Sequence, residues 1–200
     1  DTSSRMAFLQ SGELDIISTI PPQDFARMKD KEGLTGEIRP TTAGWMTLLV
    51  DNTKAPFDDP NFRLALSYAI DRKLLADQVY KGFLDPSSLP TPPRGWWFDA
   101  ATDATLGYDP AKAKEYLAKS KYASGASFDM TVATDPYMMD MNDAALLVQS
   151  MFGAIGITAR ITPMEFNVLT SRMVKGEHQS TLMLLASPGE PTYMLQGAFT

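Results

Sequence analysis

The stretch SFDMTVATDPYMMDMNDAALLVQSMFGAIGITARITP, residues 127–163, alternates between strand-like and helix-like patterns. Two short runs with β-branched and aromatic residues flank a longer run whose apolar residues recur at helical spacing, and a further helix and an apolar strand follow. A strand–helix–strand–helix–strand order predicts a parallel sheet with right-handed crossovers, and therefore an α/β fold with helices flanking the sheet. The predicted elements are strands at residues 127–134, 157–163 and 180–186 and helices at residues 141–156 and 165–176.

Upstream, the stretch APFDDPNFRLALSYAIDRKLL, residues 55–75, carries two helix-start signals. Asp59 followed by Pro60 is typical of a helix N-terminus, and Asp71 predicts the cap of a second helix that ends at Gly82. The first helix has one apolar face, which we expect to be buried. That face consists of Phe62, Ala65, Leu66, Ala69 and Ile70.

The rest of the chain is predicted from weaker patterns. An apolar pair favours a strand at residues 13–18, and the aliphatic centre of residues 44–52 predicts a strand covered on both faces. Residues 85–101 read as a long loop, because their prolines forbid regular structure. The remaining predicted helices are at residues 3–11, 21–33 and 110–122, the last capped by Asp109.

Composition excludes several classes of protein. The formal net charge is −6 and no basic run occurs, which argues against a nucleic-acid partner. There is no cysteine, so disulfides, thiolate metal sites and a cysteine nucleophile are excluded. No apolar run approaches the roughly 18 residues of a membrane helix.

The chemistry of the side chains favours binding over catalysis. His178 is the only histidine, and its setting between a helix and a strand favours a structural or solvated role. We find no credible catalytic set, metal site or phosphate-binding glycine pattern, and so expect no cofactor. Trp96 and Trp97, beside Arg94, either stack on a ligand or pack as a lid over the core. A second candidate loop follows the last strand, where ligands bind in open parallel sheets. The candidate binding residues are Arg94, Trp96, Trp97, Tyr137, Ser187, Pro188, Gly189 and Glu190.

Four motifs together resemble the family 5 extracellular solute-binding proteins of ABC importers, the peptide, nickel and opine group. Residues 55–82 are similar to the family's Pro-Phe-Asp-Asp signature and the Arg-x-Ala-Leu-x-Tyr-Ala-Ile-Asp-Arg helix that follows it. The other three resemblances agree with it in order and spacing. They are LQSGELDII at residues 9–17, GYDPAKAKEYLAKSKY at residues 107–122 and VKGEHQSTLML at residues 174–184.

The resemblance implies a type II periplasmic-binding-protein-like lobe from an incomplete two-lobed protein. Residues 1–44 would be the end of the first lobe and the approach to the hinge, and residues 45–200 most of the second lobe. The chain would then be a fragment that begins inside a helix. The intact protein would be a monomer, outside the cytoplasmic membrane and associated with it. It would hold a small peptide or similar solute between its lobes and dock on the transmembrane subunits of an ABC permease.

One position departs from the family pattern. Peptide-binding relatives place an Asp before their Asp/Glu-Pro pair, where it binds the peptide's α-ammonium group. Anchoring on Glu190-Pro191 places the neutral Ser187 there, with Leu184 at the position of the family's Trp. We therefore expect a blocked peptide, an opine, a sugar-like or another amphipathic solute, unless the alignment is offset by one or two positions. Two other classes stay open, an α/β enzyme with its catalytic residues outside this segment and a soluble peptide-binding chaperone. Permease and ATPase genes beside the gene of this protein would support import and argue against both alternatives.

Overall fold

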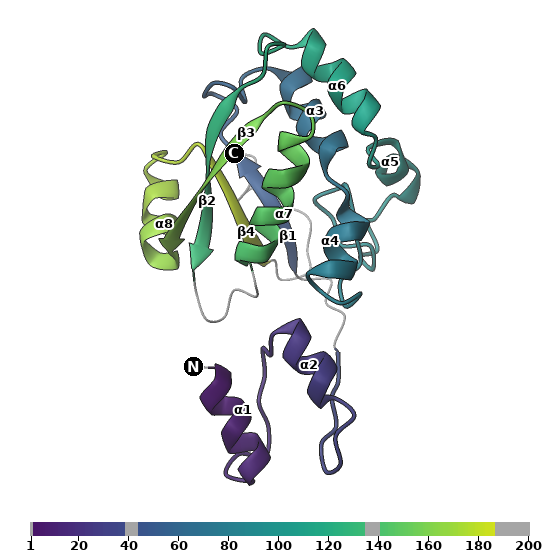
Figure 1. The fold of residues 1–200 in the computed structure, drawn as a ribbon, viewed down its shortest axis with the longest axis vertical. Helices are drawn as coiled ribbons and strands as arrows, with labels where there is room; N and C mark the ends of the chain where they lie inside the picture. The colour runs from purple at the N-terminus through teal and green to yellow at the C-terminus, as the bar shows by residue number, and fades with distance from the viewer. Residues whose placement is uncertain (1, 39–43, 135–140, 187–200) are drawn as a thin grey trace.

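The computed structural model describes residues 2–38, 44–134 and 141–186. Their body is a four-stranded sheet in the order β1-β4-β2-β3 (Figure 1). Strand β2 runs parallel to both β3 and β4, whereas β1 pairs antiparallel with β4. The strands are β1 (Gly44–Val50), β2 (Ser127–Thr134), β3 (Thr158–Glu165) and β4 (Ser180–Ala186). The predicted α/β class and the parallel βαβαβ unit are confirmed.

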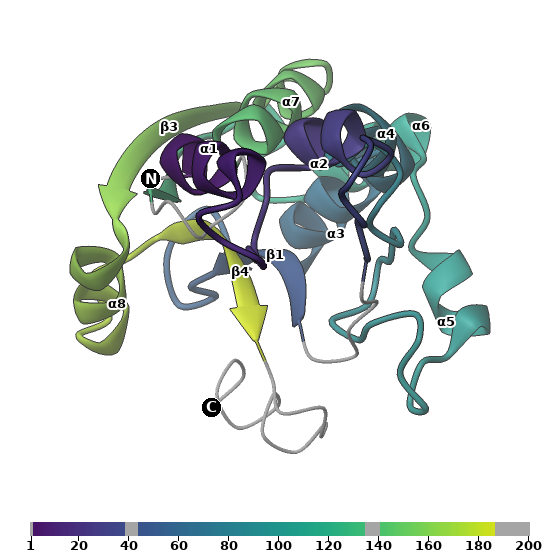
Figure 2. The same ribbon diagram turned by 90° about the horizontal axis from the view of Figure 1, so that it is seen from below.

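Helices cover both faces of this sheet. The chain moves from β2 outward to β3 and then back across β2 to β4. Right-handed crossovers therefore put α7 and α8 on opposite faces (Figure 2). The helices are α1 (Thr2–Ser11), α2 (Pro22–Met28), α3 (Pro60–Ala69), α4 (Arg72–Gln78), α5 (Ala100–Thr105), α6 (Pro110–Lys119), α7 (Met141–Gly153) and α8 (Phe166–Val174).

The two predicted caps of residues 55–75 are confirmed. A side-chain oxygen of Asp59 accepts a hydrogen bond from Asn61 N at 2.8 Å, and one of Asp71 accepts from Leu74 N at 2.9 Å. The other oxygen of Asp59 accepts from Lys121 N at 2.8 Å, which ties the start of α3 to the end of α6. The predicted apolar face of α3 is buried apart from Ile70, which is partly buried against the core.

The core lies between the sheet and the helices α3 and α7, which pack against one of its faces. Its centre is a group of aromatic rings from three parts of the chain. Phe128 of β2 packs against Phe57 at a centroid distance of 4.9 Å and against Phe152 of α7 at 6.0 Å. All three side chains are fully buried, so the sheet and α7 share one continuous apolar layer.

Three expectations from the sequence need correction. Residues 13–18 form no strand: the backbone bends at Glu13 and Asp15, no described strand pairs with it, and Ile16 is 83% exposed. Strand β1 is an edge strand among the described residues, with β4 as its partner, and residues 46–50 are partly buried on both faces, so the expected cover is present but incomplete. Helix α5 was not predicted, although Asp99 caps it through a hydrogen bond from Ala101 N.

Candidate functional site

A groove of 660 Å³ lies at the end of the sheet where β4 ends. Leu184 of β4 and Met46 of β1 form its floor, and Leu75 of α4 forms one wall. The loop that follows α4 forms another wall, and Ile20 and Phe25 of an N-terminal arm, residues 2–38, also line the groove. Parallel sheets bind ligands beyond the carboxyl ends of their strands, which is the edge occupied by this groove.

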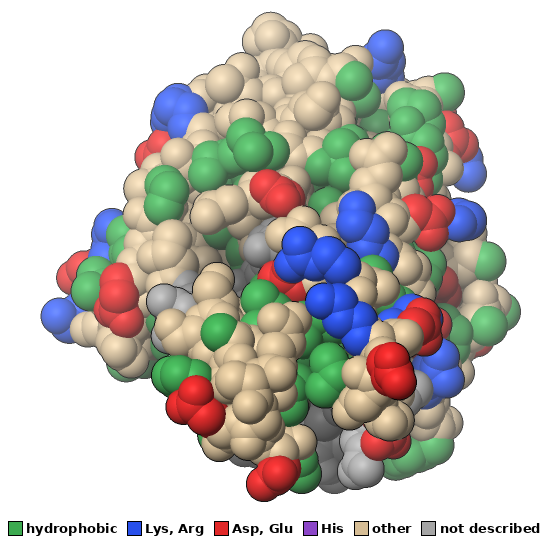
Figure 3. All heavy atoms as spheres, turned by 60° about the horizontal axis from the view of Figure 1, so that its bottom comes forward, with side chains coloured by type: hydrophobic (Ala, Val, Ile, Leu, Met, Phe, Trp, Pro, Cys, Tyr) green, Lys and Arg blue, Asp and Glu red, His purple; other side chains and the backbone are tan. Residues whose placement is uncertain are grey.

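The face that holds this edge is chemically mixed. Figure 3 shows hydrophobic side chains around a depression in this surface, with basic side chains gathered near the centre and acidic ones beside them. Among the described lining residues the charges are Arg72, Arg94, Glu37 and Asp85, and most of the others are apolar. An apolar groove with a few charged groups suits an amphipathic solute.

Side-chain contacts fix the proline-rich wall of the groove. Arg94 pairs with Asp85 across the loop, with Nε 2.6 Å from the carboxylate, and this hydrogen bond raises the pKa of Arg94. Further along, Oδ1 of Asp103 accepts hydrogen bonds from Ser87 Oγ at 2.9 Å and from Leu89 N at 3.2 Å. These contacts hold the loop in one conformation, although it has no regular secondary structure.

The described candidate residues from the sequence do not all meet at the groove. Arg94 lines it, whereas Trp96 and Trp97 are absent from its described lining. Trp96 is 82% exposed and so is not packed in the core, while Trp97 is half-buried and packs edge-on against Trp96 at 5.4 Å. The indole Nε1 of Trp97 is buried with no hydrogen-bond partner among the described residues. A ligand contact by either tryptophan stays a prediction.

The other candidates lie outside the described residues. Strand β2 ends at Thr134 and β4 at Ala186, and the remaining candidates follow these ends in the sequence. Their proposed contacts stay predictions. These residues are Tyr137, Ser187, Pro188, Gly189 and Glu190.

Sequence reasoning missed several lining residues. Tyr80 of the turn after α4, Phe25 of α2 and Ile20 before it all line the groove. Leu75 belongs to the core cluster and also lines the groove, so helical periodicity does not distinguish a core contact from a groove wall. For Phe25 and Ile20 no local signal exists, because the arm approaches the sheet through tertiary packing. The ring of Phe25 meets that of Phe83 edge-on at 5.3 Å.

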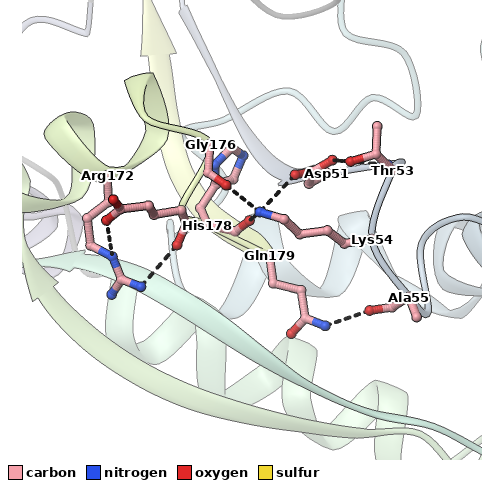
Figure 4. Close-up of polar contacts among 9 residues, drawn as sticks. Asp51, Thr53, Lys54, Ala55, Arg172, Gly176, His178 and Gln179 are labelled. Carbon is pink, nitrogen blue, oxygen red and sulfur yellow. Dashed lines mark hydrogen bonds and ion pairs between the residues drawn. The ribbon is translucent and has the colours of Figure 1, made fainter.

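A polar cluster at the opposite edge of the sheet explains the Gly-Glu-His-Gln turn. Nζ of Lys54 donates to the carbonyl oxygens of Gly176 and His178, the latter at 2.7 Å, and pairs with Asp51 at 3.0 Å (Figure 4). Gln179 adds a hydrogen bond from Nε2 to Ala55 O at 2.6 Å. The cluster therefore fastens the turn after β1 to the turn before β4.

His178 takes part in this cluster through its backbone. Its ring is half-buried, its Nδ1 has no partner among the described residues, and burial lowers the pKa of the imidazole. The predicted structural role fits this setting. No group of three or more His, Asp or Glu side chains within the described ranges could hold a metal ion. Nor does any helix there combine the length and apolar character that a bilayer crossing requires.

The fold and the groove define a solute-binding α/β protein. The family model for bacterial extracellular solute-binding proteins, family 5 middle region, matches residues 1–200, and the chain belongs to this family. The resemblance drawn from the four motifs is confirmed. The family consists of binding proteins and not of enzymes, so the expectation of binding without catalysis is confirmed at the level of the family.

Particular relatives bind different solutes. The dipeptide-binding protein of Escherichia coli K12 is 32% identical over 187 residues, which cover 92% of this chain and 34% of the relative. The glutathione-binding protein of Salmonella choleraesuis is 29% identical over 205 residues, which cover 100% of this chain and 39% of the relative. A binding protein from A. tumefaciens R10, solved with agropinic acid, has a TM-score of 0.77 at 25% identity over 92% of this chain and 37% of its own. The chain thus spans less than two fifths of the length of these relatives.

Proposed function

We propose that this chain is part of the substrate-binding component of an ABC importer, which captures a small peptide or peptide-like solute outside the cytoplasmic membrane. One observation carries the proposal. The groove of 660 Å³ lies between the N-terminal arm and the carboxyl edge of a parallel sheet, where a solute would touch both. Membership of the solute-binding family supports it, as do relatives named for dipeptides, glutathione and agropinic acid.

In this proposal the arm and the sheet belong to different lobes. Residues 1–44 end the first lobe and residues 45–200 form most of the second. A solute in the groove contacts both lobes, so it favours the closed arrangement by as much as it binds that arrangement more tightly than the open one. The closed form then docks on the membrane permease.

The first test compares the chain with the longer protein that would contain it. We expect native mass spectrometry of the longer protein to detect a co-purified solute. The isolated 200 residues should bind that solute at least 100-fold more weakly, because the contacts of the first lobe are missing. Micromolar affinity of the isolated chain by calorimetry would contradict the two-lobed arrangement.

The proposal includes a cargo without a free α-amine. A neutral Ser187 in place of the amine-binding Asp removes a charge-assisted hydrogen bond, typically about 1.5–3 kcal/mol. In the longer protein, Ser187→Asp should therefore strengthen the binding of a free-amine dipeptide by roughly 10- to 150-fold. Ser187→Asn is the matched control, since it adds similar volume without charge. Equal dipeptide affinity for wild type and Ser187→Asp would count against the assignment of this position.

A further inference from the structure

A second hollow of 340 Å³ lies next to the groove. It sits between α3, strand β1 and residues 87–90 of the proline-rich loop. Its volume falls at the lower end of the range of ligand pockets, about 300–1,000 Å³. The groove and this inner hollow have five lining residues in common, so the two hollows are adjacent. The shared residues are Met46, Arg72, Leu75, Ser87 and Leu89.

The inner hollow is positively charged. Arg63 and Arg72 line it, and its described lining contains neither Asp nor Glu. The rest of that lining consists of aliphatic, methionine and proline side chains with a few hydroxyls. A lining with two guanidinium groups and no carboxylate is unexpected in a protein whose formal net charge is −6. The charge of this hollow is therefore complementary to an anion.

Neither arginine donates a hydrogen bond to a described carboxylate. Arg72 donates three hydrogen bonds, all to neutral oxygens, those of Ser67 O, Ser67 Oγ and Ile70 O. Arg63 donates to Phe57 O at 2.6 Å. Neither forms an ion pair with a carboxylate in the described part of the chain. A guanidinium has five N–H donors, more than these bonds use, so each arginine can donate a further hydrogen bond.

Burial makes the charge of Arg72 costly. It lowers the pKa of the guanidinium, and the charge of Asp103 opposes this shift. Oδ1 of Asp103 already accepts from the loop at Ser87 and Leu89. A half-buried cation without a close counter-ion is stabilised by any anion that enters the hollow beside it.

A structural role accounts for part of this arrangement. The carbonyls of Ser67 and Ile70 lie at the C-terminal end of α3, so Arg72 also stabilises that helix end. This role explains why a cation stands at the helix end. It does not explain why the inner hollow beside Arg72 is also lined by a second arginine and by aliphatic side chains, with no described Asp or Glu.

We propose that the inner hollow is an anion subsite, which binds the carboxylate of an amphipathic solute while its compact apolar group packs against Leu89 and the sheet. The inference rests on the proposed solute-binding function and specifies the class of solute. Arg72 binds the carboxylate in a fork geometry, which suits a planar guanidinium better than an ammonium group. Arg63 adds positive charge from the α3 side. The solute enters through the groove, past the residues that the two hollows share.

The test uses the longer protein and two probes that differ in one group. N-acetyl-leucine carries a carboxylate and an apolar side chain, and N-acetyl-leucinamide is its neutral counterpart. By calorimetry, we expect the acid to bind at least tenfold more tightly than the amide. Arg72→Gln should weaken acid binding by roughly 10- to 100-fold and leave amide binding unchanged, because a charge-assisted bond is lost. Arg72→Lys should keep part of the preference.

Two further variants keep the test decisive if Arg72→Gln fails to fold. Leu89→Trp fills the inner hollow from the loop and should abolish the acid preference with both arginines intact. Arg160→Gln is the control, because Arg160 is exposed and pairs with Asp129 away from both hollows. Equal binding of acid and amide by the wild type, or an acid preference that survives both Arg72→Gln and Leu89→Trp, would overturn the subsite. The proposed function fails separately, if the longer protein carries no co-purified solute.

Discussion

At the scale of single residues, the capping aspartates show what a local pattern can predict. Asp59, Asp71 and Asp109 were recognisable as caps, because a cap needs only its own side chain and the next few amides. The structure adds contacts that no local pattern contains. Asp59 also accepts from the backbone of Lys121, and Asp58 accepts from the hydroxyl of Tyr122 at 2.6 Å. The chain folds back to supply these partners, so their identity depends on the tertiary fold.

Asp51 provides a prediction about pH. Its hydrogen bond from Thr53 is the largest of the contacts that lower the pKa of the carboxyl to about 2, below an ordinary Asp value of about 3.9. A lowered folded-state pKa stabilises the fold above the unfolded-state value, and this stabilisation is lost as the pH falls from about 4 to about 2. Denaturant titrations should therefore show a shallower loss of stability over this window for Asp51→Asn than for wild type.

A second variant separates the causes of this effect. Thr53→Ala removes the hydroxyl contact to Asp51 but keeps the carboxylate and Lys54, and its pH dependence should lie between those of wild type and Asp51→Asn. Identical slopes for wild type and Asp51→Asn between pH 4 and pH 2 would show that this cluster does not link stability to pH.

At the scale of elements, hydrophobic periodicity was sufficient to predict the helices and strands that contact the sheet or belong to it. Helix α7 and strands β2, β3 and β4 were predicted close to their observed bounds, because each has an apolar face or centre that the core buries. The pattern fails for residues 13–18, where two isoleucines resemble a buried strand but no described strand lies beside them. The groove could not be predicted either. Its walls are Leu75, Phe25 and a proline-rich loop, and each of these has a pattern that also fits core packing or an ordinary surface loop.

Helix α7 offers a matched pair of core and surface variants. Phe152 is fully buried against Phe128, so Phe152→Ala leaves a cavity and should lower the free energy of unfolding by about 3–5 kcal/mol. Leu146 is on the same helix and 57% exposed, and Leu146→Ala should change it by less than about 0.5 kcal/mol. Chemical denaturation measures both. Similar costs for the two variants would mean that α7 is packed differently from the structure described above.

At the scale of the whole molecule, the arm and the sheet body differ in how they are held. Helix α1 buries none of its residues, whereas α7 buries five. The arm meets the body at the groove, where the edge-on contact of Phe25 and Phe83 is one of its attachments. A unit with little buried surface opens at low free energy, so we expect the arm to exchange its amide hydrogens faster than the sheet.

The contact of Phe25 can be tested by hydrogen exchange. Phe25→Ala should accelerate exchange of the α2 amides by roughly tenfold, corresponding to a loss of about 1.4 kcal/mol, and leave β2 and β4 unchanged. Phe8→Ala is the control, since Phe8 is a partly exposed aromatic of α1 outside the groove lining. Unchanged protection of α2 in Phe25→Ala would show that other contacts hold the arm.

The antiparallel direction of β1 has a mechanical consequence. The arm connects to the amino end of this strand, and the Lys54 cluster fastens the turn at its carboxyl end. A pull on the arm along the strand axis therefore loads the ladder between β1 and β4 in shear, and its seven residue pairs share the force. If the arm entered at the carboxyl end instead, the same pull would peel the bonds one at a time. The edge strand thus acts as a tether that resists sliding along the sheet.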